Sequence, residues 1–165
     1  MKQILLTLSL FISLSINAQI QRTFYGLELG VATKTQVTDK LKSLGKQYTT
    51  KVDEIKTHNM KLGGYEWADV GFAFQDGKLL GVVFVSRKYP KGDGGADALI
   101  LKGLLEDKYK EYSMLNFNQA VAYKDDETIA FFLISKKYNH TEQFFLVYAD
   151  GLEAMELIRK SQSDL

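Results

Sequence analysis

The chain has 165 residues with 21 basic and 20 acidic side chains, and this near balance argues against nucleic acid or an anionic membrane as the main partner. It contains no cysteine, which excludes disulfides, thiolate catalysis and cysteine-ligated metal sites. Nine tyrosines, one tryptophan and a single proline favour a folded, β-rich domain over a disordered chain.

The first 18 residues have the features of a secretory signal peptide. Lys2 gives a basic start, a 13-residue apolar run extends from Ile4 to Ile16, and Ala18 is a small residue at the expected cleavage site. The run is shorter than the roughly 20 residues of a spanning helix. We therefore expect a soluble periplasmic or secreted protein without a membrane span, in which residues 19–165 form one domain carrying 20 basic and 20 acidic side chains.

The first helix is predicted to begin after Thr33, which has Gln36 three residues later at the spacing of a capping box. Gly45 is the expected stop. The apolar residues of this helix recur at helical spacing and are Val37, Leu41 and Leu44. Between residues 46 and 62 the sequence is polar and loosely alternating, which predicts one or two exposed strands that include a sheet edge.

The central feature is a β-hairpin over residues 70–87, with Asp76-Gly77 as its two-residue type I′ turn. Pairing outward from the turn sets Phe74 opposite Leu79. The same register sets Phe72 opposite Gly81 and Val70 opposite Val83. Strict alternation then predicts one entirely apolar face, which we expect to be the core: Val70, Phe72, Phe74, Leu79, Val83 and Val85.

The same alternation places Tyr65, Trp67 and Phe84 together on the opposite face of the hairpin. Tyrosine and tryptophan combine a large apolar area with a polar tip, which suits a surface that is wet when free and buried when bound. We therefore predict that these three residues form a binding patch on an open sheet face. The alternative is that they are half-buried at the rim of the sheet or covered by the segment around Tyr25.

A second helix is predicted from about Ala96 to Tyr112, with a buried stripe of Leu101, Leu104, Leu105, Tyr109 and Tyr112. Strands follow at residues 120–124, 128–135 and 142–149. A terminal helix begins at Gly151 and has one apolar side, formed by Leu152, Met155 and Ile158. The order predicts an α+β fold: a two-layer antiparallel sheet with helices on one face, two helix-plus-meander units (residues 24–89 and 95–165) and a C-terminal helix.

The spacing Gly30-x6-Val37-x3-Leu41-x3-Gly45, followed by strands, resembles the start of small envelope domains of the SmpA/OmlA outer-membrane lipoprotein type. The doubled helix-then-meander order resembles the fold of the β-lactamase inhibitory protein family. These resemblances imply a non-enzymatic domain that binds other proteins through an open, aromatic-lined sheet face.

Side chains that could carry chemistry are few and scattered. His58 and His140 lack the spacing of metal ligands, and no Gly-x-Ser-x-Gly motif occurs. The acidic run 125–127 is typical of a polar hairpin turn rather than of a calcium loop. An anion site at residues 92–95, before the second helix, stays open as an alternative, as does a pair of catalytic carboxylates.

The sequence therefore predicts an exported, non-enzymatic protein-binding domain, inhibitor-like or adaptor-like, that needs no cofactor and binds another envelope or extracellular protein. The alternative is a small-molecule-binding protein or hydrolase with a pocket between the sheet and the helices. A third reading is a purely structural component of the envelope.

Overall fold

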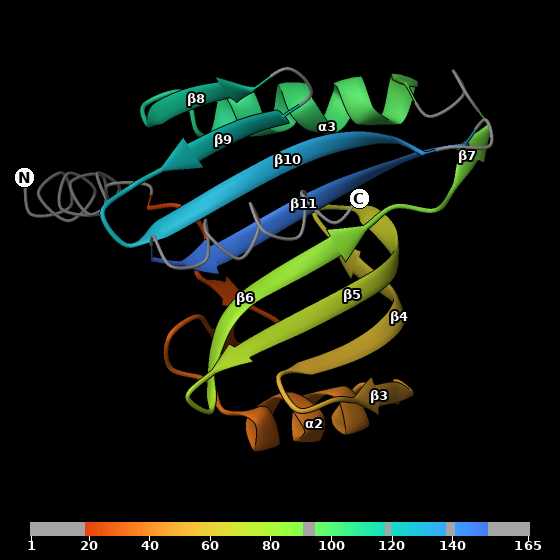
Figure 1. Cartoon of the computed structure of the whole chain (residues 1–165), viewed down its shortest axis with the longest axis vertical. Helices are drawn as coiled ribbons and strands as arrows, with labels where there is room; N and C mark the ends of the chain where they lie inside the picture. Colours follow the sequence, from red (N-terminus) through yellow and green to blue (C-terminus); the bar gives the residue numbers. More distant parts are fainter. Residues whose placement is uncertain (1–18, 91–94, 118–119, 138–140, 152–165) are drawn as a thin grey trace, which may run out of the picture.

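The computed structural model describes residues 19–90, 95–117, 120–137 and 141–151. Over these residues the chain has a mixed α+β fold with an antiparallel sheet and two helices (Figure 1). This confirms the predicted class. The predicted leader (residues 1–18) and most of the predicted C-terminal helix (residues 152–165) lie outside the described residues, so both stay predictions.

The helices are α2 (Lys34–Ser43) and α3 (Gly95–Lys108). The strands up to α3 are β1 (Thr23–Phe24), β2 (Leu27–Glu28), β3 (Tyr48–Thr50), β4 (Glu54–Leu62), β5 (Tyr65–Gln75), β6 (Lys78–Val85) and β7 (Tyr89–Pro90). The strands after α3 are β8 (Ser113–Phe117), β9 (Ala120–Lys124), β10 (Thr128–Lys137) and β11 (Thr141–Asp150).

The main sheet has nine strands. Eight of them lie in the order β3-β4-β5-β6-β11-β10-β9-β8, and the ninth, β7, pairs with the first two residues of β11. β1 and β2 form a separate two-stranded sheet. The first four and last four strands of the main sheet are each consecutive in the chain, and β6 pairs with β11 where they meet. β3 lies at an edge, which confirms the prediction for residues 46–62. The division into two helix-plus-meander units stays a prediction.

The local signals around α2 are confirmed. Thr33 is the N-cap and forms the full capping box with Gln36. Gly45 follows the helix with a φ of 65°, in the left-handed region that glycine adopts without strain. Val37 and Leu41 are buried as predicted, but Leu44 is exposed. The prediction for Leu44 is wrong because this residue is the C-cap and lies beyond the last helical turn that packs on the core.

The Asp76-Gly77 turn is also confirmed. Both residues have positive φ, 48° and 76°, as a type I′ turn requires. Phe74 pairs with Leu79, as predicted. The next pair, however, is Ala73 with Gly81, so the register shifts by one residue and Leu80 is an extra residue in β6.

This bulge reverses the facing of β6 beyond it, because side chains alternate strictly along a strand. Phe72 pairs with Val82, and Val70 pairs with Phe84. Val82 and Phe84 therefore enter the core, whereas the predicted core residues Val83 and Val85 lie on the other face. The rest of the predicted core face is buried as expected: Val70, Phe72, Phe74 and Leu79.

A second change of face occurs where β4 and β5 pair. Asn59 has a φ of 53°, and its position and that of Ala68 drop out of an otherwise continuous register. On β5 the buried positions pass from Trp67 to Val70, three residues on, instead of keeping an interval of two. The backbone irregularity therefore turns Trp67 toward the same side of the sheet as Phe72.

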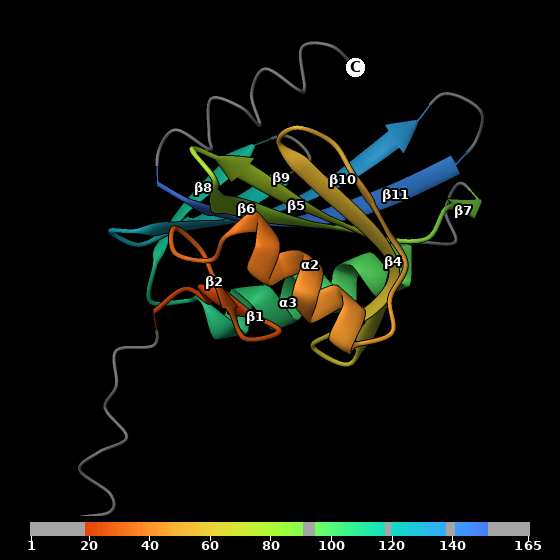
Figure 2. The same cartoon turned by 90° about the horizontal axis from the view of Figure 1, so that it is seen from below.

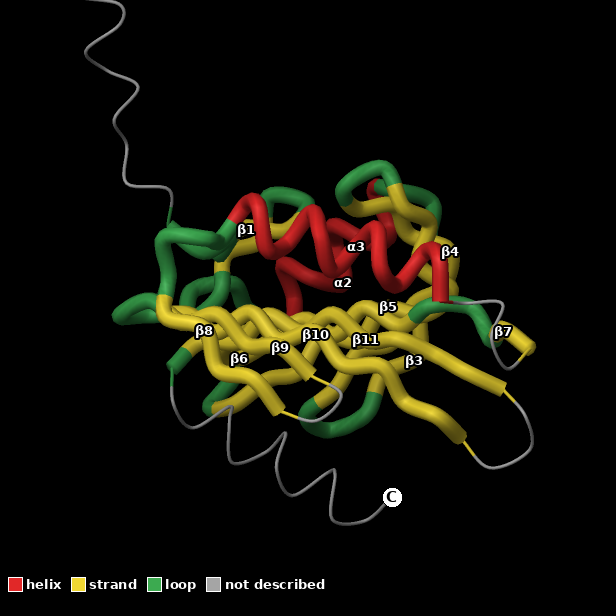
Figure 3. Tube along the Cα trace, turned by 90° about the horizontal axis from the view of Figure 1, so that it is seen from above, coloured by secondary structure: helices red, strands yellow, loops and turns green. Residues whose placement is uncertain are grey.

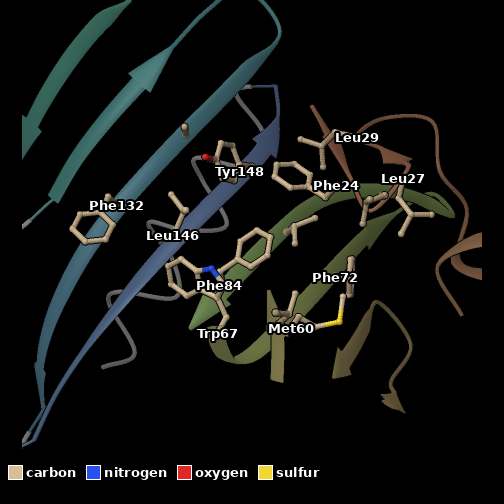
Figure 4. Packing of buried hydrophobic residues seen from close by; sticks show 14 of the residues in the cluster. Phe24, Leu27, Leu29, Met60, Trp67, Phe72, Phe84, Phe132, Leu146 and Tyr148 are labelled. Atoms are coloured by element: carbon tan, nitrogen blue, oxygen red, sulfur yellow. The ribbon is translucent and has the colours of Figure 1, made fainter. Parts of the chain in front are cut away.

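One large buried cluster joins the sheet to both helices and to the β1–β2 segment. Figure 4 shows the part of it between the sheet and the β1–β2 segment. α2 lies near β3 and α3 near β8 and β9, at opposite ends of the sheet (Figure 1). Figure 3 shows the same helices and strands from above, coloured by secondary structure. Aromatic rings are in contact at the centre of this cluster: the ring centroid of Trp67 is 5.5 Å from that of Phe84 and 5.9 Å from that of Phe144. A smaller buried cluster on the other face of the sheet contains Ala120, Ala122, Phe131 and Val147.

The segment before β1 is bonded to residues at the ends of strands from the other end of the chain. Figure 2 shows where β1 and β2 lie relative to the sheet. Arg22 donates hydrogen bonds to the Glu127 carbonyl (2.9 Å) and to Thr128 Oγ1 (3.0 Å), and its guanidinium forms an ion pair with Asp150 at 2.8 Å. The amide of Ile20 donates to Asp125 Oδ2 at 2.9 Å. These contacts hold the start of the described chain against the ends of β9, β10 and β11.

Candidate functional site

The predicted binding patch is not on an open face. Trp67 is 1% exposed and Phe84 is 0% exposed, and both rings lie inside the main cluster (Figure 4). Tyr65 is half-buried and packs edge-on against Trp67, with ring centroids 4.8 Å apart. The predicted placement of these residues is wrong because the bulge at Leu80 and the irregularity at Asn59 each reverse the facing of a strand.

The solvent face of β4 and β5 carries a histidine–carboxylate pair instead. His58 and Asp69 are cross-strand partners, and His58 Nδ1 contacts Asp69 Oδ1. Both side chains are about half exposed or more. An exposed pair of this kind adds at most about 1 kcal/mol to stability. Neither residue lines the two depressions described below, so this pair gives no site by itself.

Tyr65 does line a depression of about 290 Å³ at one end of the sheet, beside the start of α3. Its hydroxyl is 2.6 Å from that of Tyr89, and Tyr89 donates onward to Asp97 Oδ2 at 2.7 Å. Because the Tyr89 proton is committed to Asp97, Tyr65 is the donor to Tyr89, and its hydroxyl oxygen keeps its own acceptor capacity. The other lining residues are Asn59, Glu66, Ala68 and Arg87.

Two side chains at this depression, Tyr65 and Arg87, have raised pKa values. Burial and the hydrogen bond from Tyr65 to Tyr89 raise the pKa of Tyr65 well above its ordinary value. The Arg87 guanidinium lies over the Tyr89 ring at 4.8 Å, and its hydrogen bond with Tyr89 raises the pKa of Arg87. The depression therefore offers one cation, the carboxylates of Glu66 and Asp97, and a Tyr65 hydroxyl that stays neutral at neutral pH.

A second, wider depression of about 500 Å³ lies between the turn joining β1 and β2 and the outer side of α2. Its lining mixes charges of both signs with small and apolar side chains, and includes Tyr25, Glu28, Val31, Asp39 and Lys40. Burial raises the pKa of Tyr25 to about 12, and its hydroxyl donates to the Lys61 carbonyl at 3.1 Å. Its residues do not converge on one polar point as those around Tyr89 do.

The largest exposed apolar side chains of the helices lie on the outer face of α3. Leu99, Ile100 and Leu104 are 67%, 62% and 58% exposed. At 3.6 residues per turn they lie on the side of the helix opposite Ala98 and Leu105, which are buried against the main cluster. α3 therefore has two apolar faces, of which the described part of the chain covers only one. We call Ala96, Leu99, Ile100, Gly103 and Leu104 the outer stripe of α3.

Gly103 lies in the middle of this stripe, and no contact among the described residues requires a glycine there. A Cβ atom added there would meet nothing within 4 Å, and its φ is an ordinary helical one. Glycine in a helix interior costs about 0.5–1 kcal/mol relative to alanine. Gly103 leaves a notch in the outer stripe, with Ile100 and Leu104 on either side of it.

Sequence reasoning missed this surface. Leu104 was expected in the buried stripe but is exposed, and Leu99 and Ile100 were assigned no role. Leu101 is only partly buried, whereas Leu105 and Tyr109 are buried as predicted. The available signal was composition: the helix reads Leu-Ile-Leu and later Leu-Leu, so apolar residues occur all round it.

The acidic turn at residues 125–127 has a structural role. Asp125 Oδ1 accepts the amides of Glu127 (2.9 Å) and Thr128 (2.6 Å), which makes an ordinary Asx-type turn. Over the described part of the chain there is no cluster of three or more His, Asp or Glu side chains that could hold a metal ion. The proposed anion site at residues 92–95 falls mainly outside the described residues.

No helix among the described residues is long and apolar enough to cross a membrane. Comparison with protein-family models, with curated proteins and with solved structures gives no match for this chain. The resemblances to SmpA/OmlA-type domains and to the β-lactamase inhibitory protein fold therefore stay predictions, and the functional argument depends on the surface itself.

Proposed function

We propose that this chain is an exported, non-enzymatic protein-binding domain, adaptor-like or inhibitor-like, whose binding surface is the outer stripe of α3. The observation that carries the proposal is the exposure of Leu99, Ile100 and Leu104 on one face of a helix that is already packed through its other face. The partner is another envelope or extracellular protein. The proposal keeps the predicted two-layer arrangement, with the helices on one face of the sheet and two helix-plus-meander units.

Two physical arguments favour a binding role for the outer stripe over a surface that has no partner. Single exposed apolar side chains are common, but a contiguous group of them on one element marks an interaction site. A regular helix with apolar residues at i, i+1 and i+5 presents the geometry by which helices are recognised in grooves or by other helices. The surface also needs no cofactor, in keeping with a role in binding rather than catalysis.

The proposal is tested by placing a photo-cross-linking amino acid at position 100 and irradiating the protein in its native envelope. We expect a protein adduct that disappears when Leu104→Lys is added. The matched control carries the cross-linker at Val52, an exposed apolar residue on the loop between β3 and β4 (85% exposed). An adduct that forms equally from position 52, or that survives Leu104→Lys, would contradict the assignment of α3.

Export is the part of the proposal that rests on the leader. Cleavage after Ala18 would leave Gln19 as the first residue, next to the buried Ile20. Intact-mass measurement of the secreted or periplasmic protein should give a mass starting at Gln19. A protein that retains Met1 would contradict this part and leave the binding surface untouched.

A second candidate function, small-molecule binding or hydrolysis, is favoured by one observation: the depression in which Tyr65, Tyr89 and Asp97 are joined by hydrogen bonds. Trp67 is the only tryptophan and contacts Tyr65, so its fluorescence reports on this depression. Titration with small amines and carboxylates should shift that emission in the wild type but not in Tyr65→Phe. Unchanged emission with every compound would remove this candidate.

A further inference from the structure

We infer that the outer stripe of α3 binds the same stripe of a second copy of this chain, with the two helices antiparallel and Ile100 of each copy packed against Gly103 of the other. This inference rests on the proposed function and names the partner of its surface. Its evidence is the shape and charge of the stripe, which is complementary to itself in one orientation.

The first argument is the notch at Gly103. An added Cβ would meet nothing within 4 Å, so no contact with residues 19–90, 95–117, 120–137 or 141–151 requires glycine at this position. Helix propensity also disfavours glycine in a helix interior. What a missing side chain does provide is close approach of another backbone or a large side chain to the helix, since the side chains at the contact set the distance between two helix axes.

The second argument is that the stripe contains a side chain able to fill its own notch. Ile100 lies one turn before Gly103 on the same face and is 62% exposed. In an antiparallel pair whose two-fold axis passes between positions 101 and 102, Ile100 of each copy faces Gly103 of the other. The contact is made twice by symmetry, and such a two-fold interface closes on itself instead of growing into a filament.

The third argument decides the orientation and concerns Asp107. This exposed carboxylate continues the outer stripe one turn beyond Gly103, where an apolar residue would be expected. In the antiparallel pair Asp107 faces Ala96 of the other copy, at the amino-terminal end of α3, where the helix dipole favours a negative charge. In a parallel pair the two Asp107 carboxylates would face each other and repel.

The inference is tested by sedimentation velocity of the purified exported chain at concentrations up to about 200 µM, a range suited to an interface built on a single helix face. We expect a monomer–dimer equilibrium in the wild type. Gly103→Leu should weaken the dimer by at least about tenfold because it fills the notch. The same change raises helix propensity, so an unchanged or higher melting temperature separates lost association from unfolding.

The matched controls are Leu104→Lys, which should also weaken the dimer, and Val52→Lys, which should leave it unchanged. The cysteine-free background allows a geometric check. A mixture of Ala96→Cys and Asp107→Cys proteins should be joined by a short bis-maleimide, and neither protein alone should be. Cross-linking of each variant with itself instead of with the other would overturn the antiparallel arrangement.

The outcomes separate this inference from the proposed function. A wild-type chain that stays monomeric throughout overturns the second copy as partner. The proposed function still stands in that case, provided that the adduct from position 100 depends on Leu104. A dimer that resists both Gly103→Leu and Leu104→Lys overturns this inference, because the copies then associate through another face.

Discussion

The aromatic side of the hairpin and the outer stripe of α3 show opposite relations between residue type and exposure. Trp67 and Phe84, which have the character of binding residues, are buried in a cluster of rings. Leu99, Ile100 and Leu104, which have the character of core residues, face solvent. The difference shows that side-chain character alone does not decide exposure here. The irregularities at Leu80 and Asn59 turn the aromatic rings inward, and α3 exposes the apolar side that the described chain leaves uncovered.

The largest expected effect tests the aromatic side. Trp67→Ala should lower the free energy of unfolding by about 3–5 kcal/mol, because it leaves a large cavity among rings that cannot close around it. Urea denaturation followed by far-UV circular dichroism measures this loss. A loss below about 1 kcal/mol would mean that Trp67 is not in the core.

Trp67→Phe sharpens the same test. Within the described structure Trp67 Nε1 is buried without a hydrogen-bond partner. The indole therefore adds buried apolar area to the core but leaves one hydrogen-bond donor unsatisfied. Phenylalanine removes that donor and keeps much of the ring contact. We expect a loss of only about 1 kcal/mol, well below that of the alanine variant.

The next largest effect concerns Arg22, which fixes the segment leading to Phe24 against the aromatic cluster. Arg22→Ala removes charge-assisted bonds to the Glu127 carbonyl, Thr128 and Asp150 from a mostly buried side chain. We expect a loss of about 2 kcal/mol. Lys42→Ala, which breaks only an exposed pair with Asp39, is the matched control and should cost less than about 0.5 kcal/mol. Equal losses from both variants would show that the Arg22 contacts contribute nothing specific.

A smaller loss of stability is expected at alkaline pH. It again distinguishes the aromatic side of the hairpin from the outer stripe of α3. Burial raises the pKa of Tyr25 to about 12 and that of Tyr65 and Tyr148 above the ordinary value of 10.0. The unfolded chain therefore releases these protons near pH 10 while the folded chain keeps them. Stability should be constant below about pH 10 and fall as the pH rises toward about 12.

Urea midpoints measured from pH 8 to about pH 11 check this sign, and Tyr25→Phe should reduce the decline. Leu104→Ala should leave the same pH profile unchanged, because no titrating tyrosine contacts the outer stripe among the contacts described here. A midpoint that rises with pH would contradict the assignment of these tyrosines as buried and neutral.

The smallest effects belong to the outer stripe. Gly103→Ala should raise the free energy of unfolding of the monomer by about 0.5–1 kcal/mol, because it improves helix propensity and meets no neighbour. Leu104→Ala should change it by less than about 0.5 kcal/mol. Measurements at low protein concentration isolate these values from association. A large loss in either variant would mean that the stripe is covered by the chain itself.

The sequence predicted local structure where the determining chemistry is local. Thr33 with Gln36 fixed the start of α2, and Asp76-Gly77 fixed the central turn, because each acts on the backbone within three residues. The strand at Ser113–Phe117 was not predicted, because no turn signal marks it in the sequence. Its pairing with β9 defines it in the structure. The α+β class followed from the order of helices and strands.

The candidate site could not be predicted in the same way. A single extra residue at Leu80 exchanges the two faces of β6, and no motif in the sequence marks it. The positive φ of Asn59 has the same effect on β4 and β5. For α3 the periodicity was ambiguous because both faces are apolar, and only the packed structure shows that Leu105 faces inward and Leu104 outward.

The bonds of Arg22 and Ile20 have a consequence for how this chain folds. Their partners Asp125, Glu127 and Thr128 lie 105 or 106 residues further along the chain. The β6–β11 pairing, with Val85 beside Phe145, likewise joins distant segments. Contacts between residues so far apart in the sequence form only after a long loop has closed, which costs chain entropy. Folding should therefore be slow for a domain of this size. A nascent chain cannot complete the sheet until Asp150 has been synthesised, which leaves it open to chaperones throughout its elongation.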